Sequence, residues 1–241
     1  MEQGVIDTYH VKGGAAIELR FGMRARATRD IDLELAVAIE QLPVVFAAAL
    51  AVGYDDFTFA LRTRPRAVRE DAVHVEVAMS YRGLRWATID VDLAPAQAGA
   101  FADTLPIGAA EIPSIVGNAR AMKTEFLIAQ KIHAATRPDE PDYQYYYARH
   151  VVDVLFLATT GVDLVDVRTA CHAVFAARAA QDGRDWPPEL DLPTRWLGDY
   201  DVTLREYDLS IRAQDVPAAF SRFLFDVIGN SSASATRVDL A

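Results

Sequence analysis

Residues 12–35 read KGGAAIELRFGMRARATRDIDLEL, and this stretch decides the fold of the N-terminal half. It opens on a glycine pair and ends on Asp30 and Asp32, which alternate with aliphatic residues. Side chains at positions i and i+2 of a strand point to the same side, so both carboxylates face one way and the aliphatic residues face the other. Because two like charges held together repel each other, we expect a cation between them.

Residues 86–93 repeat this alternation. They read WATIDVDL and place Asp90 and Asp92 at i and i+2 among aliphatic residues. If the two strands are neighbours, three or four carboxylates converge, and such a cluster is costly unless a divalent cation neutralises it. Ligands that are all oxygen favour a hard ion, Mg²⁺ or Mn²⁺. The alternative is that each pair lies on a solvated face of an edge strand, but two pairs and a preceding glycine turn favour the metal site.

The glycine pair Gly13-Gly14 is typical of a tight turn into a short helix. Exposed N–H groups and the positive end of a helix attract anions, and the absence of side chains lets a phosphate approach. A glycine pair alone is more often a plain turn. Followed closely by the Asp30-Asp32 strand, it predicts a phosphate cradle beside a metal site. Thr28 would point to the same side as Asp30 and donate to a phosphate, or it caps the strand.

Charged residues are distributed unevenly along the 241-residue chain. The formal net charge is −10. The segment up to Asp90 has 11 Lys+Arg against 13 Asp+Glu, or −2, and the remaining 151 residues have 13 against 21, or −8. This balance excludes a generic nucleic-acid binder with a basic surface all round.

Arg29 belongs to a group of arginines that begins at Arg20 and would hold a triphosphate or an RNA backbone. For Arg24 and Arg26, a solvated loop is an equal alternative.

The remaining composition points to a cytoplasmic protein without a membrane or DNA partner. Cys171 is the only cysteine, which excludes an intramolecular disulfide and a thiolate metal site. The longest apolar run, residues 42–52, contains a proline and is too short to span a bilayer. We see no signal peptide.

The apolar patterns predict an α/β N-terminal half followed by an all-helical C-terminal half. Strands are expected over residues 29–35, 57–63, 74–81 and 84–93. Helices are expected over residues 15–21, 40–52, 123–136, 143–160, 164–181, 202–213 and 216–228, and a loop with mixed helical content over 95–113. The predicted boundaries are 1–112 for the α/β domain, 113–230 for the helical domain and 231–241 for a disordered tail.

These motifs, in this order, resemble the signature of the nucleotidyltransferase superfamily, in which a glycine pair and a short helix precede a strand with D-x-D. More closely, the chain resembles the AbiEii/AbiGii toxin family, with its MenT-like members, of type IV toxin–antitoxin and phage-defence systems. That family continues with a third acid on a later strand, a helix of the form E-x-x-x-A-x-K and a following helix of the form R-x-x-D-x-x-D. This chain has EFLIAQK over residues 125–131 and ARHVVD over residues 148–153. The resemblance runs from Lys12 to about Ala158.

The resemblance implies a nucleotidyltransferase-type mixed sheet with flanking helices and a nucleoside triphosphate (NTP) substrate with Mg²⁺ or Mn²⁺. The implied metal ligands are Asp30, Asp32 and Asp90, the last chosen over Asp92 because the family has an I-D-hydrophobic pattern. The implied nucleotide-binding residues are Gly13, Gly14, Thr28, Arg29 and Lys131. Lys131 would bind the triphosphate, and Asp153 would orient Lys131 or help to position the acceptor.

The residues themselves give Asp153 a second interpretation. It lies in a largely apolar helical pattern, and a buried carboxylate needs a partner. Arg149, four residues earlier, is the local candidate, and Lys131 on the preceding helix is the tertiary one. A structural ion pair that joins two helices is therefore the alternative to a catalytic role.

By resemblance, the acceptor is the 3′ end of a tRNA, and the protein is a toxin with a cognate antitoxin. One alternative is transfer to a small molecule or a protein side chain, which the acidic C-terminal half favours. Another is a catalytically degenerate relative that binds only nucleotide or a partner. It is favoured by His150, where the family often has an acid, and by the short segment before the glycines.

The histidines show no metal-ligand spacing along the chain. His10, His74, His133 and His172 are scattered, and we expect each to be a surface residue or a satisfied core residue.

Overall fold

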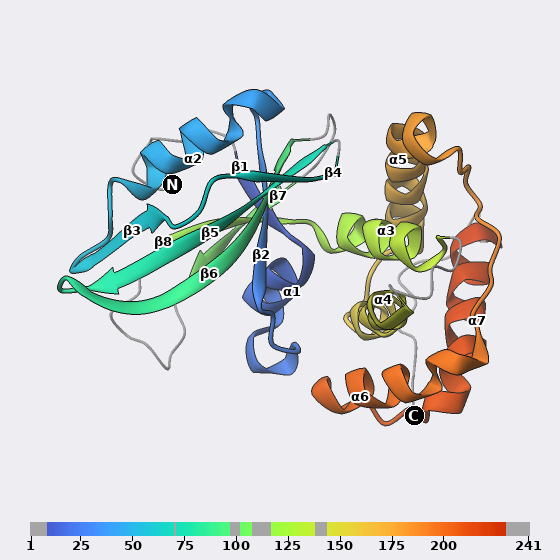
Figure 1. The fold of residues 1–241 in the computed structure, drawn as a ribbon. Coiled ribbons are helices and arrows are strands. Elements are labelled where there is room, and N and C mark those ends of the chain that lie inside the picture. The colour runs from blue at the N-terminus through green and yellow to red at the C-terminus, as the bar shows by residue number, and fades with distance from the viewer. Residues whose placement is uncertain (1–8, 70, 97–101, 108–116, 138–143, 230–241) are drawn as a thin grey trace. The chain divides into compact units, whose positions relative to one another are not determined.

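The computed structural model describes residues 9–69, 71–96, 102–107, 117–137 and 144–229. The chain forms two units that divide between Met122 and Lys123, the first built on a sheet and the second on helices (Figure 1). The predicted domain boundary at 112/113 and the predicted tail over 231–241 lie outside the described residues.

The N-terminal unit is built on one mixed sheet. Across the sheet the strand order is β3-β5-β6-β2-β1-β8-β7, and β4 pairs with β5. β2 runs parallel to β6 and β1 parallel to β8, and the other described pairs are antiparallel. The strands are β1 Tyr9–Lys12, β2 Asp30–Leu35, β3 Phe57–Leu61, β4 Arg66–Arg69, β5 Ala72–Tyr81, β6 Leu84–Pro95, β7 Ala102–Ile107 and β8 Gly117–Met122.

Two helices lie on the aliphatic face of this sheet. They are α1, Gly13–Phe21, and α2, Leu42–Leu50. Leu33 of β2 is almost fully buried. Side chains of α1, α2 and the aliphatic face, Leu33 among them, line a cavity of about 490 Å³. The alternation in β2 therefore works as predicted, because the aliphatic residues face the helices and the carboxylates project from the opposite side.

Four strands were not expected from the sequence. β1 and β4 are only four residues long, too short for an alternating pattern to stand out. β1 nevertheless lies inside the sheet, between β2 and β8, and its Tyr9, His10 and Val11 are buried. The mixed helical content expected over 95–113 is wrong for residues 102–107, which form β7 and pair with β8. Strand pairing over long sequence separations decides these segments rather than local propensity.

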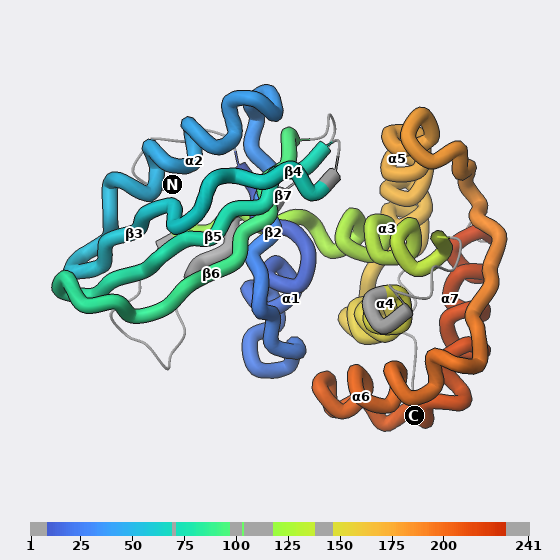
Figure 2. The backbone as a smooth tube through the Cα atoms, in the orientation of Figure 1, coloured from blue at the N-terminus to red at the C-terminus, as the bar shows by residue number. Residues whose placement is uncertain are grey.

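The C-terminal unit consists of helices, as predicted, and Figure 2 traces its path. Its helix α4 packs against α3, α6 and α7, and residues 151–158 of α4 are all buried. Within the described chain, no helix combines the length and apolar character needed to cross a bilayer. The main helices are α3 Thr124–Ala135, α4 Gln144–Ala158, α5 Leu164–Asp182, α6 Leu197–Glu206 and α7 Val216–Gly229.

The helix expected over 202–213 is wrong in its bounds. α6 begins earlier, at Leu197, and ends at Glu206. Asp208 has a φ of 52°, in the left-handed region, which a continuing right-handed helix does not allow. The turn at Asp208 places Tyr207 at the end of α6, where its ring stacks on Phe156 of α4.

His133 is a satisfied core residue, as expected. It is fully buried, with Nδ1 3.1 Å from Arg178 Nη1 and Nε2 3.1 Å from Asp182 Oδ2. Burial, and then the neighbouring guanidinium groups of Arg178 and Arg184, lower the pKa of His133 to about 3. The imidazole is therefore neutral at neutral pH and joins α3 to the end of α5.

Candidate functional site

Four carboxylates lie side by side on the polar face of the central strands. In the parallel pair of β2 and β6, Asp30 is opposite Asp90 and Asp32 is opposite Asp92. Residues in register project to the same face of a sheet, so the two predicted acid pairs converge. Asp30 and Asp90 are exposed, whereas Asp32 and Asp92 are half-buried.

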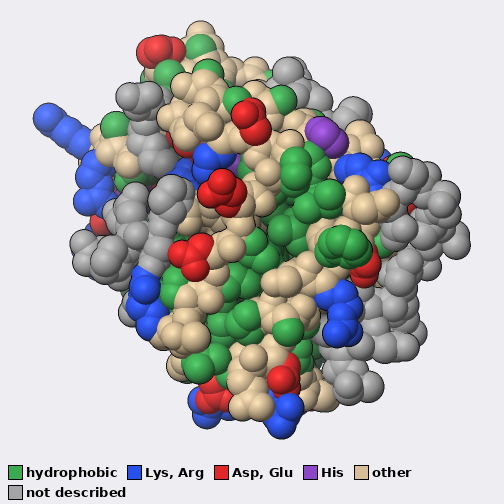
Figure 3. Space-filling view, turned by 90° about the vertical axis from the view of Figure 1, so that its right-hand side faces the viewer, with side chains coloured by type: hydrophobic (Ala, Val, Ile, Leu, Met, Phe, Trp, Pro, Cys, Tyr) green, Lys and Arg blue, Asp and Glu red, His purple; other side chains and the backbone are tan. Residues whose placement is uncertain are grey.

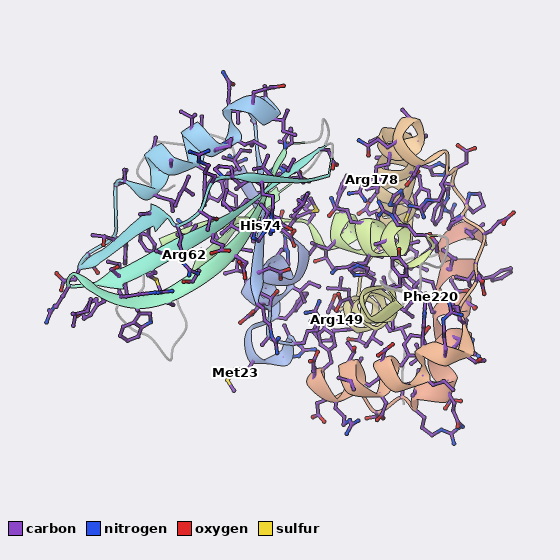
Figure 4. The ribbon with its side chains drawn as sticks, viewed as in Figure 1. Met23, Arg62, His74, Arg149, Arg178 and Phe220 are labelled. Atoms are coloured by element: carbon purple, nitrogen blue, oxygen red, sulfur yellow. The ribbon has the colours of Figure 1, made fainter. Side chains whose placement is uncertain are left out.

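Strand β5 adds a histidine and a glutamate to this face, because His74 is opposite Asp92 and Glu76 is opposite Asp90. His74 Nδ1 lies 2.8 Å from Asp92 Oδ1, and its Nε2 lies 3.5 Å from Asp90 Oδ1. Figure 4 labels His74 on the sheet, together with Arg62, which donates to Glu76 at 3.1 Å. No spacing along the chain marks His74 as a site residue, since only strand pairing brings it to the carboxylates.

The glycine pair lies directly against the carboxylates. Gly13 has a φ of 64°, and a Cβ added to it would lie 1.9 Å from Asp32 Oδ2. A Cβ on Gly14 would lie 2.7 Å from Thr28 Oγ1, and this hydroxyl donates to Asp30 Oδ1 at 2.9 Å. The start of α1, with its free N–H groups, therefore approaches Asp32 and Thr28 closely only because both positions are glycine. Arg29, the remaining predicted residue of this unit, is exposed on the chain beside Asp30.

A buried glutamate, Glu34, lies on β2 beside the carboxylates and the glycine pair. Glu34 is 1% exposed and accepts a hydrogen bond from Lys12 Nζ at 3.1 Å, and His10 Nε2 lies 3.0 Å from its other oxygen. Burial raises the pKa of Glu34, but the His10 hydrogen bond and the charge and hydrogen bond of Lys12 outweigh it and lower the pKa to about 2. Glu34 is thus ionised at neutral pH and holds Lys12 immediately before the glycine pair.

The sequence carries a local signal for Glu34 as a residue of this face. Glu34 follows Asp32 at i+2, so it continues the polar face of the same strand. Its burial and its two cationic neighbours come from the pairing of β1 with β2, in which His10 is opposite Glu34 and Lys12 is opposite Asp32.

In the C-terminal unit, α3 and α4 bring Lys131 and Asp153 together. Lys131 Nζ lies 2.8 Å from Asp153 Oδ2, and Asp153 is fully buried. Tyr207 donates to Asp153 Oδ1 at 2.6 Å, and His150 Nδ1 lies 3.3 Å from Lys131 Nζ. Lys131 is therefore an ion-pair partner of Asp153, one of the two candidates from the sequence. Tyr207 comes from α6, distant along the chain, and no local pattern indicates its role.

Comparison with known families identifies the chain. The family model described as "Nucleotidyl transferase AbiEii toxin, Type IV TA system" matches residues 3–227. The chain belongs to this family. It is thus a nucleotidyltransferase toxin of the type IV toxin–antitoxin class, which confirms the resemblance and the enzyme class predicted from the motifs. Nucleotidyltransferases generally use an NTP and a divalent metal ion, and a type IV toxin implies an antitoxin partner.

A solved structure supports the fold. The chain is similar to MenT4, a nucleotidyltransferase toxin from Mycobacterium tuberculosis H37Rv, with a TM-score of 0.58 and 14% sequence identity. The similarity covers 94% of this chain and 88% of that one. At this identity the likeness shows a shared fold alone. Comparison with curated proteins gives no significant match.

The glycine cradle can be tested with a matched pair of variants. Gly13→Ala places an alanine at a left-handed φ and brings its Cβ into a clash with Asp32, whereas Gly183→Ala places an alanine at a left-handed φ of 66° with no heavy atom within 4 Å of its Cβ. We predict that Gly183→Ala costs about 1–2 kcal/mol of unfolding free energy and keeps its activity. Gly13→Ala should displace Asp32 and lower nucleotidyl transfer about 100-fold in protein that is still folded. Equal activities of the two folded variants would contradict a role of Asp32 in nucleotidyl transfer.

Proposed function

We propose that this protein transfers a nucleoside monophosphate from an NTP to the 3′ end of a tRNA. The observation that carries the proposal is the polar face of the sheet, where carboxylates in register on β2 and β6 lie against the glycine start of α1. Family membership supplies the reaction class. The acceptor and the roles of individual residues are our inference.

The carboxylate oxygens on this face are suitable ligands for a divalent metal ion. Asp30, Asp32 and Asp90 offer oxygen ligands only, which suit a hard ion such as Mg²⁺ or Mn²⁺. We assign Asp90 rather than Asp92 as the third carboxylate, because Asp90 is exposed and lies opposite Asp30, and its contact with His74 is longer, at 3.5 Å against 2.8 Å for Asp92. When bound, such ions would activate the acceptor hydroxyl and neutralise the leaving pyrophosphate.

The chain's own groups would position the triphosphate. The N–H groups at Gly13 and Gly14 are hydrogen-bond donors beside the carboxylates, and Arg29 is an exposed cation next to them. The hydroxyl of Thr28, which donates to Asp30 in this structure, would turn to donate to a phosphate oxygen. We also propose that Lys131 contacts the triphosphate, as the family resemblance implies, and that Asp153, which accepts a hydrogen bond from Tyr207, holds the Lys131 side chain. Positioning and charge stabilisation are most of what phosphoryl transfer requires.

The proposed step is a displacement at the α-phosphorus. An oxygen of the acceptor forms a bond to this phosphorus, and the bond to the oxygen that bridges the α- and β-phosphates breaks. Pyrophosphate leaves with that electron pair, and the proton of the acceptor hydroxyl passes to a carboxylate of the site or to water. The NTP and tRNA that the step consumes place the reaction in the cytoplasm.

An alternative acceptor, a small molecule or a protein side chain, is favoured by the charge of the chain beyond Asp90, which is −8 by the counts above. On the face shown in Figure 3, the described acidic and basic side chains are scattered among hydrophobic ones and form no continuous basic area. RNA would therefore have to bind elsewhere. In the segment from Arg20 to Arg29, Arg20 is paired with Asp103 and Arg26 is buried, so the exposed Arg24 and Arg29 are our candidates.

The acceptor can be identified by label transfer. Purified protein is mixed with Mg²⁺ or Mn²⁺, total bacterial tRNA and, in turn, each α-³²P-labelled NTP. We predict label in the tRNA band with the wild type, none with Asp30→Asn, and wild-type labelling with Asp201→Asn, an exposed aspartate of the C-terminal unit. Label on the protein itself would show that the acceptor is a protein side chain and not tRNA. Absence of label from every acceptor, with folded protein, would overturn the proposal.

The role of Lys131 can be separated from its structural contribution. Because removing one member of a buried ion pair leaves the other charge uncompensated, Asp153→Leu and Lys131→Met alone should each cost about 3–5 kcal/mol of unfolding free energy. The double variant Lys131→Met/Asp153→Leu should recover part of that loss, measured by urea denaturation. We predict that the recovered double variant is folded but inactive. Wild-type activity in the double variant would show that the pair only joins two helices.

A further inference from the structure

We propose that His74 is a nitrogen ligand of the metal centre and that, with Glu76 and Asp90, it makes the centre prefer a transition-metal ion such as Mn²⁺ over Mg²⁺. The proposal rests on the proposed function only in that Asp90 is shared with the ligand set assigned above. It adds two residues of β5 that the motifs did not indicate.

The three side chains already face one another. His74, Glu76 and Asp90 can each present one ligand atom such that all three atoms lie within 4.8 Å of one another. They come from the adjacent strands β5 and β6, where Glu76 and Asp90 are in register and His74 is two residues from Glu76 on the same face. His74 and Glu76 are only half-exposed, so the strands restrict their directions.

His74 and Glu76 each contact a further side chain that is not part of the proposed ligand set. His74 Nδ1 is 2.8 Å from Asp92 Oδ1, which leaves Nε2 directed towards Asp90 at 3.5 Å. Arg62 Nη1 donates to Glu76 Oε2 at 3.1 Å, and the second carboxylate oxygen remains for a further contact. A metal-bound histidine commonly donates its other ring N–H to a carboxylate, and bound carboxylates are themselves hydrogen-bonded. Asp92 and Arg62 are placed to serve as these supporting groups.

An imidazole ligand changes the preferred ion. Mg²⁺ takes oxygen ligands and keeps several waters, whereas imidazole nitrogen suits the later first-row transition metals best, and Mn²⁺ accepts it more readily than Mg²⁺ does. A ligand set of two carboxylates and one imidazole therefore favours Mn²⁺ over Mg²⁺ more than a set of carboxylates alone. The competing role for His74 is a positioning one, in which it orients Asp92 by hydrogen bonding and never touches the ion. The two roles predict different spectra.

Pulsed electron paramagnetic resonance of bound Mn²⁺ distinguishes them, because a directly bonded imidazole adds ¹⁴N modulation to the electron spin echo. We would load tag-free full-length protein with Mn²⁺ and compare the wild type with His74→Gln and His74→Asn, which retain a hydrogen-bonding side chain. His172→Gln is the matched control, since His172 is an exposed histidine of the C-terminal unit. Calorimetric titrations with Mn²⁺ and Mg²⁺ would give the affinities, and circular dichroism would confirm folding.

The expected result is ¹⁴N modulation in the wild type and His172→Gln that is lost in a folded His74 variant. The affinity for Mn²⁺ should fall by about tenfold or more and that for Mg²⁺ by less than about threefold in the same variant. Bound Mn²⁺ without ¹⁴N modulation, an equal loss of both affinities, or no Mn²⁺ binding would overturn the proposal. No NTP or RNA is present, so a protein that binds Mn²⁺ through His74 but transfers no nucleotide would overturn the proposed function alone.

Discussion

The parallel pairing of β2 with β6 is the constraint on which the rest of the site depends. It sets Asp30 beside Asp90 and Asp32 beside Asp92, so that carboxylates of like charge are neighbours across two strands. Like charges directly opposite each other destabilise a sheet. The aliphatic residues of the same strands face α1 and α2, and a register slip that separated the acids would expose these residues. Burial on one face therefore maintains the charge cluster on the other.

The neighbouring strands and turns supply groups that counter this repulsion. Thr28 donates to Asp30, and His74 bonds Asp92. At the other end of the polar face, Glu34 is buried with Lys12 and His10. These contacts hold the side chains in place, and a divalent cation would complete the neutralisation. The hydrogen-bonded and ion-paired side chains of this face thus stabilise the sheet, and its exposed carboxylates are available for the proposed chemistry.

Sequence reasoning reached the parts of the site that local patterns encode. The i, i+2 spacing of Asp30 and Asp32 correctly assigned both to one face, and the glycine pair correctly began a helix next to them. The assignment of Lys131 as a candidate partner of Asp153 also agrees with the structure. The first two inferences follow from residues close together in the chain, and the third follows from a buried carboxylate that needs a cation and from the lysine on the preceding helix.

The remaining contacts depend on pairing between distant segments. His74 reaches Asp90 and Asp92 only through the antiparallel register of β5 with β6, and Glu34 is buried only because β1 pairs with β2. Tyr207 reaches Asp153 because α6 ends at Glu206, two residues before the left-handed Asp208. A single sequence does not specify such registers, since the side-chain alternation of one strand is compatible with several partners.

The most direct test of the account is to follow which bond of the NTP breaks. Protein, metal ion and acceptor would be incubated in parallel with NTP labelled at the α-phosphate and at the γ-phosphate, and the acceptor and the released phosphates would be separated. The account predicts the α-label in the acceptor and the γ-label in pyrophosphate, in equal amounts, and neither with Asp30→Asn. The γ-label in the acceptor, or its release as orthophosphate without pyrophosphate, would contradict attack at the α-phosphorus.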